Sequence, residues 1–287
     1  MPSPRLRNQW SISVYTGRTL AALVPASATG RPALTGRDAT DLPGRAVADP
    51  FLLIHDGAWL LFFEIWNADT GHGEIAYATS NDAGVSWSYQ ASVLREPFHL
   101  SYPQVLAWEG SVYMVPESRQ DGAVHLYVAD HFPRGWRRVS TLVRGPFADA
   151  TLVRHDQRWW MFAQRGLDEL CLFSSSQLET GWAPHPASPL WPGNRSRTRP
   201  AGRVLVEEGR LIRLAQDGWP WYGHSVRAFE IQQLSPSAYE ERELPGSPIL
   251  RPSRTGWNAV GMHHLDAVRR DDGQWLAVVD GATLAEF

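Results

Sequence analysis

The hydrophobic positions of this chain fall into short runs that repeat along its length. One spacing occurs five times. A first position, polar or apolar, opens an apolar run; the turn position lies eight residues after it, and the closing position, which is polar, lies fifteen residues after it. The turn position is Gly in four copies, and the closing position is always acidic or an amide. The first, turn and closing residues are Asp49, Gly57 and Glu64; Tyr102, Gly110 and Glu117; Asp149, Gln157 and Gln164; Ala201, Gly209 and Gln216; and Leu265, Gly273 and Asp280.

Each copy predicts a β-hairpin, because two apolar runs joined by Asp-Gly or Glu-Gly are typical of antiparallel strands and a tight turn. A further apolar run follows each of the first four hairpins, and the copies recur every 47 to 64 residues. This is the period of a propeller blade. We therefore predict an all-β fold, a five-bladed β-propeller with four-stranded antiparallel blades around a central channel, in one domain spanning residues 1–287.

The N-terminal segment is predicted to close the ring. Residues 10–17 (WSISVYTG) form one strand, and the chain ends with too few residues to complete a fifth blade. Propellers commonly close by adding a strand from the other terminus, which leaves no exposed sheet edge. Residues 18–45 are expected to be a long connection, and residues 186–200 a loop.

A second local pattern supports a propeller. Residues 80–87 (SNDAGVSW) have the Ser-x-Asp-x-Gly-x-x-Trp form of the Asp box. In this motif Asp82 is expected to accept backbone hydrogen bonds, Gly84 to adopt positive φ, and Trp87 to pack between strands. The motif predicts fold and carries no catalytic information.

Composition narrows the choice of partners. With a net charge of −3 and no basic block, nucleic acid and anionic membrane surfaces are not expected as partners, whereas a small-molecule or carbohydrate ligand is. The single Cys171 lies in an apolar run with no cationic neighbour, which predicts a buried structural thiol. Neither a signal-peptide pattern nor an apolar run of membrane-spanning length is present, so a cytoplasmic protein is expected.

Several motifs resemble known families. The phrase ADPFL in the first copy, the Asp at the same place in the third, and the five-blade count resemble the five-bladed propeller glycosidases of the furanosidase type, the arabinanase, xylosidase and fructosidase group. Longer phrases, namely EPFHLSYPQV, VPES, RPAGRV, LAQD and GWNAVGMHHLD, are more similar to the propeller domain at the N-terminus of plant glucosamine inositolphosphorylceramide transferases and its standalone bacterial relatives. This resemblance runs from about Trp10 to Gly281 and implies the fold. In the plant proteins another domain is assigned the sugar transfer, so it implies little about chemistry.

The glycosidase resemblance implies roles for individual carboxyl groups. Glycoside cleavage needs one carboxylic acid that protonates the leaving oxygen and one carboxylate that activates water or attacks carbon. Asp49 matches the family's base, and Asp149 matches its orienting Asp. Pro50 is expected to hold Asp49 in an extended backbone at the start of a strand. The family's acid is a Glu in the fourth blade, where this chain has Gln216-Asp217; the role therefore passes to Asp217, to Glu117, or to no residue.

Other polar and aromatic residues are candidates for substrate binding near the same end of the channel. Arg203 is expected to point into the channel and either to bind an anionic ligand group or to pair with Asp217 or Glu117. Aromatic residues there can stack on sugar faces or fill the interfaces between blades. The full set of candidates is His99, Tyr102, Arg199, Arg203, Gln216, Trp221, Tyr222, His263, His264 and Asp266.

No metal or cofactor is expected. In the GMHHLD segment, strand alternation lets only His264 and Asp266 share a face, which is a weak metal pattern. By analogy with propeller glycosidases, a central channel ion near His264 is compatible with the sequence.

Three functional classes stay open. The first is a glycosidase-like enzyme of the hydrolase or glycosyl-transfer type that acts on a glycoside or sugar-containing small molecule. The second is a sugar-binding propeller without catalytic activity, as the missing Glu in the fourth blade suggests. The third is a non-hydrolytic biosynthetic enzyme that reuses the channel, in which Arg203 and the histidines would matter more than the carboxylates.

Overall fold

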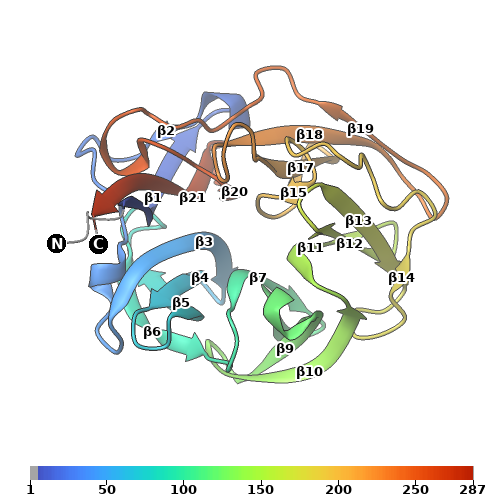
Figure 1. Ribbon diagram of the computed structural model, residues 1–287, viewed down its shortest axis with the longest axis horizontal. Helices are drawn as coiled ribbons and strands as arrows, with labels where there is room; N and C mark the ends of the chain where they lie inside the picture. Colours follow the sequence, from blue (N-terminus) through green and yellow to red (C-terminus); the bar gives the residue numbers. More distant parts are fainter. Residues whose placement is uncertain (1–5, 287) are drawn as a thin grey trace.

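Five antiparallel sheets arranged in a ring form the fold (Figure 1). The computed structural model describes residues 6–286. Each sheet is one blade, and its first strand lies nearest the centre of the ring. The five-bladed β-propeller predicted from the repeat is confirmed.

In each blade, the strands are named in their order from the centre of the ring to its outer edge. Blade one contains β3 (Gly44–His55), β4 (Ala58–Asn67), β5 (His72–Ser80) and β6 (Ser88–Leu94). Blade two contains β7 (Ser101–Trp108), β8 (Ser111–Glu117), β9 (Ala123–His131) and β10 (Arg134–Arg144). Blade three contains β11 (Phe147–His155), β12 (Arg158–Arg165), β13 (Glu169–Ser175) and β14 (Ala183–Pro184).

The innermost position of blade four is divided between two short strands. Both β15 (Arg199–Pro200) and β16 (Leu205–Glu207) pair with β17 (Arg210–Asp217), which is followed by β18 (Ser225–Leu234) and β19 (Tyr239–Glu243). Blade five contains β20 (Leu265–Arg269), β21 (Trp275–Glu286), β1 (Leu6–Gly17) and β2 (Val24–Pro25). Short 3-10 helices lie at Leu20–Ala22, Gly36–Asp38, Arg119–Asp121 and Gly256–Asn258.

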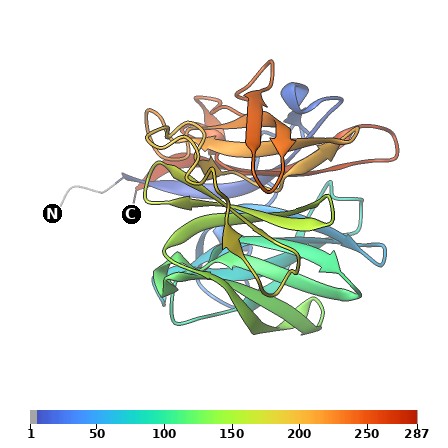
Figure 2. The same cartoon turned by 90° about the vertical axis from the view of Figure 1, so that its right-hand side faces the viewer.

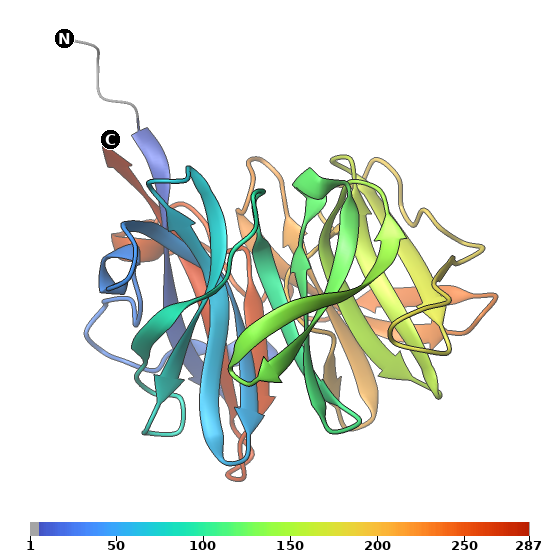
Figure 3. The same cartoon turned by 90° about the horizontal axis from the view of Figure 1, so that it is seen from below.

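The N-terminal strand closes the ring. β1 pairs antiparallel with β21 over its whole length, from Leu6 opposite Glu286 to Gly17 opposite Trp275. As a result the first and last strands of the chain, β1 and β21, lie side by side (Figures 2 and 3). The strand predicted for residues 10–17 therefore begins four residues earlier, and β2, which lies inside the expected long connection, forms the outer edge of the blade.

The predicted tight turns have the backbone that hairpins require. Both central residues have positive φ in four of them, for example 48° at Asp56 and 77° at Gly57 in the β3–β4 turn. Such turns match the right-handed twist of the strands they join. In the third blade Gln157 takes the place of Gly at a φ of 60°.

Buried side chains fill the interfaces between blades. The described residues form five apolar clusters, and each joins two neighbouring blades; Phe51, Phe62, Tyr102 and Met114, for example, belong to the cluster between blades one and two. Cys171 is buried between blades two and three, and burial raises the pKa of its thiol. The predicted burial of this thiol is confirmed.

The Asp box forms as predicted. Asp82 accepts hydrogen bonds from the backbone N–H groups of Val85 and Ser86 at 3.1 and 2.8 Å. Gly84 has a φ of 84°, and Trp87 is buried with its indole N–H donating to the Gly84 carbonyl. Hydrogen bonds from the Ser86 hydroxyl and backbone lower the pKa of Asp82 to about 2.

Blades four and five meet at a glycine. A Cβ on Gly202, which has a φ of 136°, would lie 1.8 Å from the Leu265 carbonyl oxygen. We expect Gly202→Ala to reduce the free energy of unfolding by several kcal/mol, because both backbones must move apart. Gly209→Ala is the control: its φ is also positive, at 79°, but a Cβ would meet nothing within 4 Å. Urea unfolding should give a cost of about 1 kcal/mol for the control; equal costs would contradict the predicted clash.

No helix within residues 6–286 is long and apolar enough to cross a membrane.

Candidate functional site

A bulge interrupts the innermost strand of the first three blades at the same place. The strand register skips two residues there, from Ala48 to Phe51 in β3, for example. One residue at each bulge has a left-handed backbone: Asp49 with φ 52°, Tyr102 with φ 48° and Asp149 with φ 51°. The extended backbone expected at Asp49 is therefore wrong. A bulge adds a residue to one strand, and Asp adopts the resulting positive φ more readily than most residues.

Closing residues of the repeat accept hydrogen bonds from the bulges at Asp49 and Asp149, and in each case the closing residue belongs to the neighbouring blade. The backbone N–H of Asp49 donates to Asp280 Oδ2 at 3.0 Å, across the junction of blades one and five. The backbone N–H of Asp149 donates to Glu117 Oε2 at 3.2 Å, across the junction of blades three and two. An acid at the closing position thus satisfies a buried donor that the bulge leaves outside the ladder.

Asp149 lies in a polar group formed by three blades. Its carboxylate accepts hydrogen bonds from Arg199 Nε at 2.6 Å and from the Gln216 amide at 3.1 Å. Arg199 Nη2 also lies 3.5 Å from Glu117 Oε2, and the guanidinium stacks 5.2 Å from the centre of the Tyr222 ring. Gln216 Oε1 is buried and has no hydrogen-bond partner among the described residues, which leaves an acceptor for a ligand donor.

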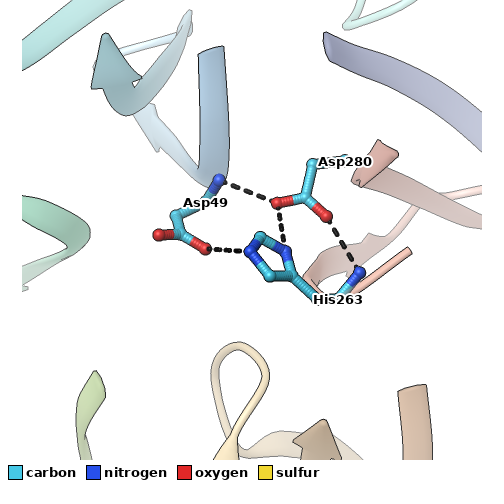
Figure 4. A group of neighbouring side chains, drawn as sticks. All are labelled: Asp49, His263 and Asp280. Atoms are coloured by element: carbon cyan, nitrogen blue, oxygen red, sulfur yellow. Dashed lines mark hydrogen bonds and ion pairs between the residues drawn. The ribbon is translucent and has the colours of Figure 1, made fainter. Parts of the chain in front are cut away.

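Asp49 lies in a second group with His263 and Asp280 (Figure 4). His263 Nδ1 is 2.7 Å from Asp280 Oδ2, and His263 Nε2 is 3.9 Å from Asp49 Oδ1. Asp280 Oδ1 accepts the backbone N–H groups of His263 and His264 at 3.1 and 3.0 Å. Asp280 therefore fixes the histidine and the Asp49 bulge together.

The two groups influence each other electrostatically. Burial raises the pKa of Asp49 to about 7; His263 acts to lower it, and Asp149 adds to the rise. Burial also raises the pKa of Asp149 to about 7, with Arg199 acting to lower it and Glu117 to raise it. Burial and the charges of four other acids raise the pKa of Glu64 well above its usual range. We call these five residues the carboxyl cluster: Asp49, Glu64, Glu117, Asp149 and Asp280.

A cleft opens beside Arg199. It has a volume of about 160 Å³, and its lining includes Gln164, Gln216 and the exposed aromatic residues Trp221 and Tyr222. The Trp221 indole N–H donates to the Val260 carbonyl at 2.8 Å, which fixes that side chain. Polar groups at the floor and aromatic rings at the rim suit a sugar, whose faces stack on aromatic rings while its hydroxyls form hydrogen bonds.

Arg203 and two other candidates are structural. Arg203 forms a bidentate ion pair with Asp266, in which Nε and Nη2 each lie 3.0 Å from one carboxylate oxygen. It also donates hydrogen bonds to the backbone carbonyls of Leu52 and Val105 at 2.9 and 3.1 Å. Its expected pairing with Asp217 or Glu117 is wrong. Tyr102 is fully buried and exchanges hydrogen bonds with Gly202 across the centre of the ring. These residues join blades instead of facing a ligand.

The remaining candidates differ in their distance from Asp49 and Asp149, and His264 Nδ1 lies 3.6 Å from Asp49 Oδ1. Asp217 accepts hydrogen bonds from Ser196 and Arg227 at 2.8 Å each, which ties it to its own blade. His99 Nε2 lies 3.7 Å from Glu64, and burial lowers its pKa to about 4. His264 is completely buried, with its ring edge-on to Phe51.

In the segment GMHHLD, strand alternation predicted only that His264 and Asp266 could share a face, which is a weak metal pattern. Gly261–His264 precede β20, so alternation does not apply to them, and Asp266 is engaged by Arg203. Asp49, His263 and Asp280 have ligand-type atoms within 4.8 Å of one another. They fit a metal poorly, because both oxygens of Asp280 already accept hydrogen bonds from backbone N–H groups.

Glu64, Gln164 and Asp280 were absent from the residues selected by sequence reasoning, as was Trp10, whose ring stacks on His263 at 3.9 Å. The signal for the first three was present, since each is a closing residue of the repeat. A closing residue is adjacent to a first residue of the next blade only after the ring has formed. Trp10 had no such signal.

Comparison with known proteins identifies the family. The family model described as "Glucosamine inositolphosphorylceramide transferase 1, N-terminal" matches residues 7–282. The chain belongs to this family. Glucosamine inositolphosphorylceramide transferase 1 of Oryza sativa subsp. japonica is 33% identical over an alignment of 301 positions that covers 97% of this chain and 40% of the rice protein. The Arabidopsis thaliana protein of the same name is 34% identical over 296 residues, covering 95% of this chain and 39% of that protein. The chain thus spans about two fifths of these relatives.

Solved structures share the fold of this family member. The catalytic domain of a GH62 α-L-arabinofuranosidase from Coprinopsis cinerea has a TM-score of 0.63 at 14% identity, covering 99% of this chain and 98% of that one. An exo-β-1,3-galactanase from Clostridium thermocellum has a TM-score of 0.65 at 13% identity, covering 96% of this chain and 66% of that one. At such low identity the likeness concerns the fold alone.

Proposed function

We propose that this chain is a glycosidase-like enzyme that acts on a glycoside at the cleft beside Arg199, using paired carboxyl groups. The observation that carries the proposal is the pairing of Asp49 and Asp149: they occupy equivalent bulges, are buried, and each has a pKa of about 7. Carboxyl groups with perturbed pKa values in a concave site are typical of acid–base catalysis. The likeness to sugar-acting relatives supports a sugar as the ligand.

In this proposal Asp49 removes a proton from the attacking water or sugar hydroxyl. Asp149 holds Arg199 and Gln216 in place, and through its charge it raises the pKa of Asp49. Arg199, Gln216 and Tyr222 contact the substrate.

Glu64 is the best candidate for the proton donor. A general acid must be protonated before the reaction, and burial together with the neighbouring carboxylates raises the pKa of Glu64 well above its usual range. Glu117 and Asp217 are less suited, because Arg199 and Arg227 already donate hydrogen bonds to their carboxyl oxygens.

A sugar-binding propeller without turnover is the second candidate. The observation that favours it is Gln216, an amide at the blade-four position where the glycosidase resemblance places the acid. The amide cannot protonate a leaving group, but it donates to Asp149 and can bind a hydroxyl.

The test is a leaving-group comparison. We expect the chain to cleave at least one member of a panel of α-L-arabinofuranosides, β-galactosides and glucosaminides, chosen after the relatives' names. For glycosides with poor leaving groups, Glu64→Gln should lower kcat about 10² to 10⁴-fold, and for dinitrophenyl glycosides much less, because a good leaving group needs no acid. Saturable binding without turnover by the unaltered protein would establish the second candidate, and neither binding nor turnover would refute both.

A further inference from the structure

His263 is held more rigidly than a space-filling histidine needs to be. Its Nδ1 atom lies 2.7 Å from Asp280, its face stacks on Trp10 with an angle of 15° between the rings, and the Tyr222 ring meets it edge-on at 5.4 Å. Gly223, with a φ of 71°, keeps this packing close, since a Cβ there would lie 2.8 Å from the Trp10 ring. The Nε2 end of the imidazole ring takes part in none of these contacts, and it points toward Asp49 (Figure 4).

Asp280 is suited to hold a positive charge on this ring. It accepts three backbone N–H groups, those of Asp49, His263 and His264. Burial acts to raise the pKa of Asp280, but His263 and the backbone donors outweigh it, and the pKa is lowered. Asp280 is therefore a buried anion, and a neighbouring imidazolium is its natural counter-ion.

We propose that His263, fixed by Asp280, carries a positive charge that favours the ionised form of Asp49 inside the carboxyl cluster. Without a cation at Nε2, burial and the nearby acids would favour the neutral form of Asp49, which cannot accept a proton. His263 is thus a positioning residue that acts through Asp49. An effect of His263 on the rate of glycoside cleavage rests on the proposed function, whereas an effect of His263 on the charge of Asp49 does not.

The surroundings of His263 support this assignment. Burial acts to lower the pKa of His263, but Asp280, followed by Asp49 and Asp149, outweighs it and raises the pKa. His264 does not compete for the proton, because burial lowers its pKa to about 4. The titratable groups facing or acting on His263 are Asp280 on β21, Asp49 on β3, Asp149 on β11, Tyr222 between β17 and β18, and the adjacent His264.

The test follows the charge of Asp49 without a substrate. Protein labelled with ¹³C at the Asp side-chain carboxyls is titrated by NMR, and Asp49→Asn assigns the Asp49 resonance. In the unaltered protein the midpoint is expected near 7. In His263→Gln it should rise by about one pH unit or more, which is about a tenfold fall in the ionised fraction of Asp49 at pH values below the midpoint. His99→Gln is the matched control: His99 also lies beside an acid of the cluster but is neutral at pH 7, so its removal should leave the midpoint unchanged.

A second measurement keeps the proposal testable if His263→Gln does not fold. In the unaltered protein, the ¹⁵N shifts of the His263 ring should show both nitrogens protonated at pH 6. A neutral His263 at that pH, or an unchanged Asp49 midpoint in His263→Gln, would overturn the proposal. Failure of every glycoside in the activity panel would count against the proposed function and leave this titration result standing.

Discussion

Asp49→Asn is expected to remove turnover while making the protein more stable at pH 8. Asn cannot accept the proton of the attacking group, so kcat on any glycoside substrate should fall about 10² to 10⁴-fold. The side chain keeps its size, and Asn tolerates the left-handed backbone that Asp49 adopts at φ 52°. The fold should therefore persist.

The stability gain follows from the pKa of Asp49. Because its folded-state value of about 7 lies above the ordinary 3.8, the stability that this group contributes is fully present below about pH 4 and is lost as the pH rises through 7. Asn does not titrate, so the variant should gain about 4 kcal/mol relative to the unaltered protein at pH 8, since each pKa unit is worth about 1.4 kcal/mol, and little at pH 4. Urea unfolding at both pH values measures this difference.

Asp56→Asn provides the control for both effects. Asp56 also has a left-handed backbone, with φ 48°, but its side chain is 93% exposed in the β3–β4 turn. Its replacement should change neither turnover nor the pH dependence of stability. Full turnover by Asp49→Asn would refute the catalytic role of Asp49, and an unchanged pH dependence would refute its buried, partly neutral state.

The second large effect is expected at the centre of the ring. Arg203 joins blade four to Asp266 of blade five and to backbone carbonyls of blades one and two. Asp266 in turn accepts the Leu52 backbone N–H at 2.8 Å. Asp266→Leu should reduce the free energy of unfolding by about 3–5 kcal/mol, because it leaves the Arg203 charge buried without its partner.

The double variant Arg203→Met/Asp266→Leu should recover part of that loss, since no unpaired charge then remains. The exposed ion pair Arg137–Asp130 is the control, with Arg137 Nε 2.9 and 3.1 Å from the two carboxylate oxygens. Arg137→Met should cost less than about 1 kcal/mol in urea unfolding. A similar cost at both sites would show that Arg203 does not fasten the blades.

Much of the fold was predictable because its determinants are local. The β3–β4 hairpin follows from two continuous apolar runs and the Asp56-Gly57 turn, and the Asp box from hydrogen bonds that span no more than four residues. Repetition of one hairpin then implied blades, because a lone hairpin cannot bury its apolar face. The first residues Asp49 and Asp149 were also found this way, as the polar exceptions at a repeated position.

The partners of these residues were not predictable from local patterns. Asp49 meets Asp280 across 231 residues, and Arg203 meets Leu52 across 151. Strand alternation says which face a side chain takes but not which blade lies opposite, and it failed at His263 and at the Asp49 bulge, where the backbone is not regular. The chain sequence by itself determined the hairpins, their number and the two exceptional acids. Only the tertiary structure decided which acid is held by Arg199, which lies beside His263 and which fastens the blades, because each of those contacts joins residues of different blades.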